Sequence, residues 1–88
     1  MPNKLEEARK IINEVDAQMA ELFVKRMRAA EEICAYKMEH GLPILDKQRE
    51  EAVIARNAER IEDEVLKEYY IDYLQHVMAV SQIGRAHV

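Results

Sequence analysis

This sequence contains few cysteines and glycines and no cluster of histidines, and each of these shortages excludes a kind of protein or site. Cys34 is the only cysteine among 88 residues, so a disulfide framework and a thiolate metal cluster are excluded and a reducing compartment is expected. Two glycines leave no Gly-rich loop that could hold a phosphate group. The histidines, at positions 40, 76 and 87, share no ligand spacing, so no metal site is predicted.

Long apolar runs and an excess of basic residues are also lacking. No stretch approaches the ~18 apolar residues of a membrane-spanning helix, and the charged start of the chain does not resemble a signal peptide. Seventeen acidic residues against thirteen basic ones give a net charge of −4, which argues against a nucleic-acid or anionic-membrane partner. We therefore expect a cytoplasmic, single-domain protein in which any anion site is local.

The stretch from Asn3 to His40 contains neither glycine nor proline, and its apolar residues recur at helical spacing. Steps of three and four residues define an apolar seam, interrupted by Arg26, that consists of Leu5, Ala8, Ile12, Val15, Met19, Leu22, Ala29, Ile33 and Tyr36. One uninterrupted helix of about 57 Å is expected, capped by Asn3 and ended at Gly41. Cys34, beside the seam, is expected to be a small buried residue.

The length of this helix has a consequence for assembly. A compact chain of this size has a radius of gyration of roughly 12 Å, so the helix must extend beyond any core that its own chain can build. The exposed seam then needs a second chain. The sequence predicts an intertwined homodimer.

Two shorter helices are expected to follow the long one. Asp46 is a suitable N-cap for the first of them and Asp63 for the second. The residues expected to face inward from these two helices are Val53, Ile54, Ala58, Ile61, Leu66, Tyr70, Tyr73, Leu74, Val77 and Ser81. No strand pattern or repeat is visible, so the predicted fold is all-α, with one long and two shorter helices in one domain spanning residues 1–88.

Arg26 is the clearest candidate for chemistry, because a guanidinium within an apolar seam needs an anion or water. A salt bridge or a register-setting role explains it equally well from periodicity alone. Lys37 follows eleven residues later and returns to within about 20° of the same helix face, although a lysine near a helix C-terminus is also favoured by the helix dipole. Arg9 is by itself an ordinary flanking charge. In an antiparallel dimer, however, one chain's Arg9 would approach the other chain's Arg26 and Lys37 and form a cationic pocket for a dianion.

A set of spaced residues runs through the first two predicted helices. It comprises a Leu-x3-Arg opening, a mid-helix arginine, a lysine eleven residues later and an Asp-x-x-Arg-Glu motif. In this chain the matching residues are Leu5, Arg9, Ile12, Asp16, Leu22, Arg26, Lys37, Pro43, Asp46, Arg49 and Glu50. This pattern, with Tyr69, Tyr70 and Ser81 later in the chain, resembles the all-helical chorismate mutase family over residues 4 to about 82.

The resemblance implies a homodimeric enzyme of the shikimate pathway that rearranges chorismate to prephenate without a cofactor, in aromatic amino-acid biosynthesis. It implies that Arg26 and the partner's Arg9 clamp the two carboxylates of chorismate. Lys37 would donate a hydrogen bond to the ether oxygen, whose negative charge grows as the C–O bond breaks.

The remaining site residues are also assigned through the resemblance. Glu50 would accept a hydrogen bond from the ring hydroxyl, Asp46 and Arg49 would shape that side, and Ser81 would close the pocket. Without the resemblance, Glu50 would be interpreted as a solvated first-turn acid, Arg49 as a surface charge and Ser81 as a tolerated small polar residue.

The end of the chain departs from the family pattern. Four residues after Ser81 the family usually has a glutamine that reaches the ether oxygen, whereas this chain has Arg85, preceded by Gly84. A guanidinium could do the work of the glutamine, but we expect the helix to fray here and aim Arg85 poorly. Residues 83–88 (IGRAHV) look like a translated sequencing-library adaptor, and we interpret them as a non-native tail.

Two other functions remain open from the sequence. The same fold and cationic pocket serve isochorismate pyruvate-lyase, which acts on a similar dianion. A non-catalytic helical module for dimerisation or regulation is the second alternative. Relatives also occur fused to another shikimate-pathway enzyme, so the chain is either a stand-alone enzyme or one module of a longer one.

Overall fold

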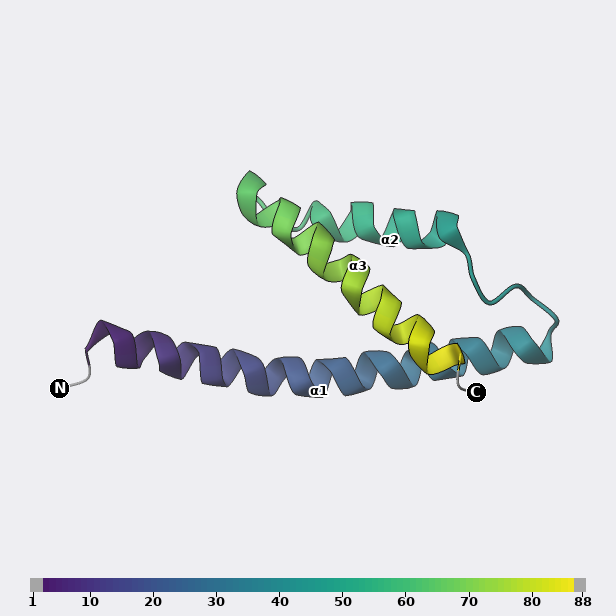
Figure 1. Ribbon diagram of the computed structural model, residues 1–88, viewed down its shortest axis with the longest axis horizontal. Helices are drawn as coiled ribbons and strands as arrows, with labels where there is room; N and C mark the ends of the chain where they lie inside the picture. Colours follow the sequence, from purple (N-terminus) through teal and green to yellow (C-terminus); the bar gives the residue numbers. More distant parts are fainter. Residues whose placement is uncertain (1–2, 87–88) are drawn as a thin grey trace. The chain divides into compact units, whose positions relative to one another are not determined.

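The computed structural model describes the backbone of residues 3–86 and the side chains of residues 3–81. Three helices follow one another along this part of the chain: α1 (Lys4–Glu39), α2 (Lys47–Ala58) and α3 (Glu64–Ala86) (Figure 1). The described residues contain no strand. The predicted all-α fold of one long and two shorter helices is therefore confirmed.

Both ends of α1 are held by the residues expected from the sequence. At the start, the Glu6 amide donates a hydrogen bond of 2.9 Å to Oδ1 of Asn3. At the end, Gly41 has a positive φ of 64°, a conformation that other residues rarely adopt. The Leu42 amide donates to the carbonyl oxygen of Lys37 at 2.8 Å and the Gly41 amide to that of Met38 at 3.4 Å, the bond pattern of a Schellman motif.

The two shorter helices are capped by aspartates. Oδ1 of Asp46 accepts a hydrogen bond of 3.0 Å from the Arg49 amide at the start of α2. Oδ1 of Asp63 accepts from the amides of Val65 and Leu66, at 2.9 and 3.2 Å. Each cap satisfies amide groups that have no partner within the helix, so both predicted helix starts are confirmed.

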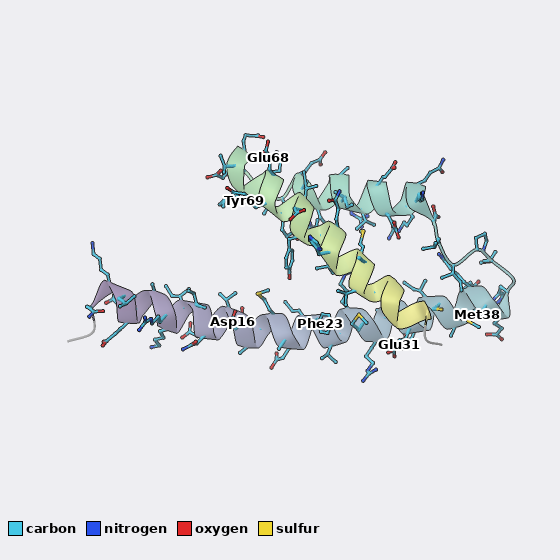
Figure 2. All side chains as sticks on the ribbon, viewed as in Figure 1. Asp16, Phe23, Glu31, Met38, Glu68 and Tyr69 are labelled. Carbon is cyan, nitrogen blue, oxygen red and sulfur yellow. The ribbon has the colours of Figure 1, made fainter. Side chains whose placement is uncertain are left out.

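The chain divides into two compact units, residues 1–30 and residues 31–88. The first unit consists of the N-terminal part of α1. Every described side chain from residue 3 to residue 26 is exposed, including the seam residues Leu5, Ile12 and Leu22. In Figure 2 the side chains project from all around this part of the helix, with Asp16 and Phe23 labelled. The seam residues that the structure describes in this unit are therefore all exposed.

The second unit contains the end of α1 together with α2 and α3, which contact each other. Its buried residues are Cys34, Ala58, Leu74, Met78 and Ser81. Cys34 is only 3% exposed, as expected from its place beside the seam. Its thiol lies 3.9 Å from the sulfur of Met38 on the next turn.

Two residues predicted to face inward from α3 do not. Leu66 is 56% exposed and Tyr73 is 46% exposed, whereas Leu74 and Ser81 are buried and Tyr70 is half-buried. The helical period shows which residues of α3 share a face. It does not show which of them are covered by another part of the same chain.

Near the end of the chain, the backbone of α3 remains helical through Gly84 and Arg85 to Ala86. The helix therefore does not stop at Gly84. Arg85 was predicted to bind substrate poorly, but its side chain lies outside the described residues, as do the other side chains of the predicted tail.

Candidate active site

Six of the predicted site residues belong to the second unit, five of them with a described side chain, and Lys37 is the first of these along the chain. It lies in the last turn of α1 and is half-buried. Its Nζ donates a hydrogen bond of 3.3 Å to the carbonyl oxygen of Ile44, in the connection that leads to α2. The Schellman motif fixes its backbone at the same time, because the Lys37 carbonyl accepts the Leu42 amide.

An open hollow of about 460 Å³ lies beside this lysine, and we call it the Lys37 hollow. Its lining includes Lys37, Leu42, Pro43, Asp46 and Lys47. The hollow thus combines apolar connection residues with two ammonium groups and the carboxylate that caps α2. Such a lining suits a small ligand that has both an apolar body and negative charge.

A second hollow of about 310 Å³ lies between α2 and α3, and we call it the interhelix groove. From α2 it is lined by Lys47, Glu50, Glu51 and Ile54, which share one helix face. From α3 it is lined by Gln75, Met78 and Ala79. Glu50 is half-buried here and is the predicted site residue that this groove contains.

The other two predicted residues of this unit with described side chains, Arg49 and Ser81, are not in the lining of either hollow. Arg49 is exposed on α2, and its amide is engaged by the Asp46 cap. Ser81 is only 2% exposed, and its hydroxyl donates a 3.1 Å hydrogen bond to the carbonyl oxygen of Val77 one turn earlier. The Ser81 side chain is therefore part of the packed face of α3.

Arg9 and Arg26, the two predicted carboxylate clamps, lie on the part of α1 that belongs to the first unit, and both are exposed. Arg26 and Lys37 are carried by one continuous helix. They are eleven residues apart in the sequence, and they belong to different units of the chain.

Lys47 is a candidate site residue that was not predicted from the sequence. It lines both hollows and so joins the places where Lys37 and Glu50 lie. In the sequence it appears only as an ordinary charged residue after a helix cap. Its place in both linings depends on how the connection and α3 lie beside α2, which residue type and helical period do not determine.

The described part of the chain gives no indication of a metal centre or a membrane segment. Within it, no group of three or more histidine, cysteine, aspartate or glutamate side chains is arranged to hold a metal ion. None of its helices is both long enough and apolar enough to cross a lipid bilayer.

Comparison with known proteins adds the family. Residues 8–82 match the family described as chorismate mutase type II. No curated protein and no solved structure matches the chain significantly. The matched segment contains seven of the eight predicted site residues, all except Arg85. Because it covers most of the 88 residues, the chain belongs to the chorismate mutase type II family.

Proposed function

We propose that this protein is a chorismate mutase, which rearranges chorismate to prephenate in the cytoplasm as a step of aromatic amino-acid biosynthesis. Family membership supports the class of reaction. The observation that carries the proposal is the position of Lys37. Lys37 is half-buried, its ammonium group donates a hydrogen bond to the Ile44 carbonyl oxygen, and the residue lines a hollow that is also lined by Asp46.

In the proposed reaction the protein forms no covalent bond with the substrate. Within one molecule of chorismate the ether C–O bond breaks and a C–C bond forms, so no proton, electron or cofactor is exchanged. Negative charge grows on the ether oxygen as its bond to carbon breaks. An ammonium group aimed at that oxygen stabilises the transition state more than the ground state, and we assign this role to Lys37.

We assign the two carboxylates of chorismate to Arg26 and to Arg9 of the partner subunit. A guanidinium group binds a carboxylate through two parallel hydrogen bonds, which fixes orientation as well as supplying charge. Holding both carboxylates restricts the substrate to the compact conformer in which the reacting carbons meet. This removes an entropic part of the barrier.

The remaining predicted residues complete the proposed site. Glu50 accepts a hydrogen bond from the ring hydroxyl, and Asp46 and Arg49 shape the start of α2 around it. Ser81 belongs to the α3 wall. Arg85 is proposed as the donor that stands where relatives have a glutamine.

A homodimer is part of this proposal. The exposed apolar side chains on the first unit, among them Leu5, Ile12 and Leu22, support it because burying them would remove a large apolar surface from water. The partner subunit would supply the second arginine of each site. A chain of this size also gains stability by association.

The direct test is an assay of chorismate consumption, followed by its ultraviolet absorbance, with products identified by chromatography. We expect cofactor-independent formation of prephenate, lost in Arg26→Ala and retained in Arg28→Ala, which removes a neighbouring arginine of the same helix. Absence of turnover above the uncatalysed rate would contradict the proposal. Release of pyruvate from isochorismate, in place of prephenate formation, would assign the site to the lyase.

A further inference from the structure

Lys47 is a cation shared by the linings of two hollows, and it has no ion-pair partner among the described residues. It lines both the Lys37 hollow and the interhelix groove. Its side chain is exposed and forms no ion pair or hydrogen bond with a described residue. Glu50 and Glu51 lie one turn further along α2 and line the interhelix groove together with Lys47.

The position of Lys47 in its helix makes a purely structural role a poor explanation. It is the first residue of α2, where the positive end of the helix dipole repels a cation and favours an acid. Lys67, by contrast, lies in the first turn of α3 and is compensated by Glu64, whose carboxylate is 3.4 Å from its ammonium. Lys47 therefore gains nothing from the dipole of its own helix, although the Asp46 carboxylate caps the same helix start.

The net negative charge of the whole chain suggests an electrostatic role for this cation. The net charge is −4, so the protein as a whole repels an anionic ligand. A local positive charge at the opening of a site offsets this repulsion and raises the local concentration of the anion. Lys47 and Lys37 are the two cations in the described lining of the Lys37 hollow.

We propose that Lys47 is a substrate-recruiting residue that draws a dicarboxylate ligand into the Lys37 hollow and does not touch the reacting atoms. This inference rests on the proposed function for the identity of the dianion, which is chorismate. Lys37 then acts on the transition state, whereas Lys47 acts on encounter and binding. The two lysines are therefore expected to have different kinetic signatures.

The test measures kcat, KM and chorismate affinity for Lys47→Gln beside Lys67→Gln, which removes the same charge away from both hollows. In Lys47→Gln we expect kcat/KM to fall about three- to tenfold at low ionic strength, with kcat nearly unchanged, because one steering charge is lost. The difference in kcat/KM between Lys47→Gln and the unmodified protein should nearly vanish when the salt concentration is raised from about 0.01 M to about 1 M. The Debye screening length then becomes shorter than the distance over which Lys47 attracts the incoming anion. Lys67→Gln should match the unmodified protein.

Two further variants separate recruitment from folding. Lys47→Arg keeps the charge and should restore kcat/KM, which a loss of packing would not allow. Lys47→Glu should lower kcat/KM further while leaving thermal stability equal or higher, because an acid suits this helix position.

The outcomes distinguish this inference from the function on which it rests. If the unmodified protein is active and Lys47→Gln behaves like Lys67→Gln, the recruiting role is wrong and the proposed function stands. If Lys47→Gln loses kcat instead of kcat/KM at low salt, the recruiting role is also wrong. If the unmodified protein neither binds nor converts chorismate, both proposals are overturned.

Discussion

The side-chain ammonium of Lys37 donates a hydrogen bond to the backbone carbonyl oxygen of Ile44, across 3.3 Å. This bond joins the last turn of α1 to the connection before α2. The backbone of the same residue is fixed by the Leu42 amide, 2.8 Å from the Lys37 carbonyl oxygen. Lys37 is thereby held at both its main chain and its side chain, which is the condition for a preorganised donor.

The first prediction concerns this donor. Replacing Lys37 with alanine should lower kcat strongly while KM changes much less, because the proposed interaction develops only in the transition state. A loss of roughly 3 kcal/mol or more in transition-state stabilisation is expected, by comparison with other aimed donors. Steady-state kinetics with chorismate measures both constants.

Lys67→Ala is the control, since this lysine lies outside both hollows and is paired with Glu64. It should leave both constants unchanged. Equal kcat in Lys37→Ala and the unmodified protein would show that Lys37 serves only the helix end and the Ile44 carbonyl.

The second prediction concerns Gly41, which ends α1. Its φ of 64° suits glycine, and a Cβ built there meets no atom within 4 Å. Gly41→Ala should therefore destabilise the protein by about 1–2 kcal/mol through backbone strain alone, without a steric clash. Gly41→Asn should cost less, because asparagine tolerates this conformation. Urea unfolding of the two variants measures the difference, and equal stabilities would contradict the argument.

The sequence predicted helix ends well because each end is determined by a few neighbouring residues. Asn3, Asp46 and Asp63 are caps in the structure, and Gly41 has the left-handed conformation expected of it. These features need only local hydrogen bonds, so periodicity and residue type were sufficient to predict them.

Burial and the composition of the hollows could not be predicted in the same way. Leu66 belongs to the apolar face of α3 by period but is exposed, because burial depends on a neighbour that the period does not supply. Lys47 is a candidate site residue because it lines two hollows, one beside the connection and one between α2 and α3. Both properties arise from segments distant in the sequence.

The third prediction separates two roles of Asp46, which caps α2 and lines the Lys37 hollow. Asp46→Ala removes the oxygen that accepts the Arg49 amide and should cost about 1 kcal/mol of stability. Asp46→Asn keeps an oxygen able to cap the helix and should preserve stability. If Asp46→Asn is also fully active, the site uses the capped backbone of residue 46; if it is stable but impaired, the carboxylate itself takes part. Thermal unfolding and chorismate turnover, measured on both variants, distinguish these outcomes.

The last prediction concerns the two arginines of the first unit, Arg9 and Arg26. If each site takes Arg26 from one chain and Arg9 from the other, chains carrying Arg9→Ala and chains carrying Arg26→Ala should each form inactive homodimers. A mixed dimer of the two variants contains one site with both arginines intact and one site that lacks both. Mixing equal amounts should therefore restore part of the activity, towards a quarter of the unmodified rate, because about half of the dimers are mixed at equilibrium and each has one working site.

Subunit exchange is followed independently by mass spectrometry of differently tagged chains, so that a failure to mix is recognised. A mixture of Arg26→Ala with Arg28→Ala chains is the control. In those mixed dimers one of the two sites keeps both Arg9 and Arg26, whereas in the Arg28→Ala homodimer both sites keep them. Activity should therefore be proportional to the number of intact Arg26 side chains. Recovery in the first mixture requires that the two arginines of one site come from different chains. Full exchange without recovery would show that each site takes both arginines from one chain, and the shared-site dimer would be wrong.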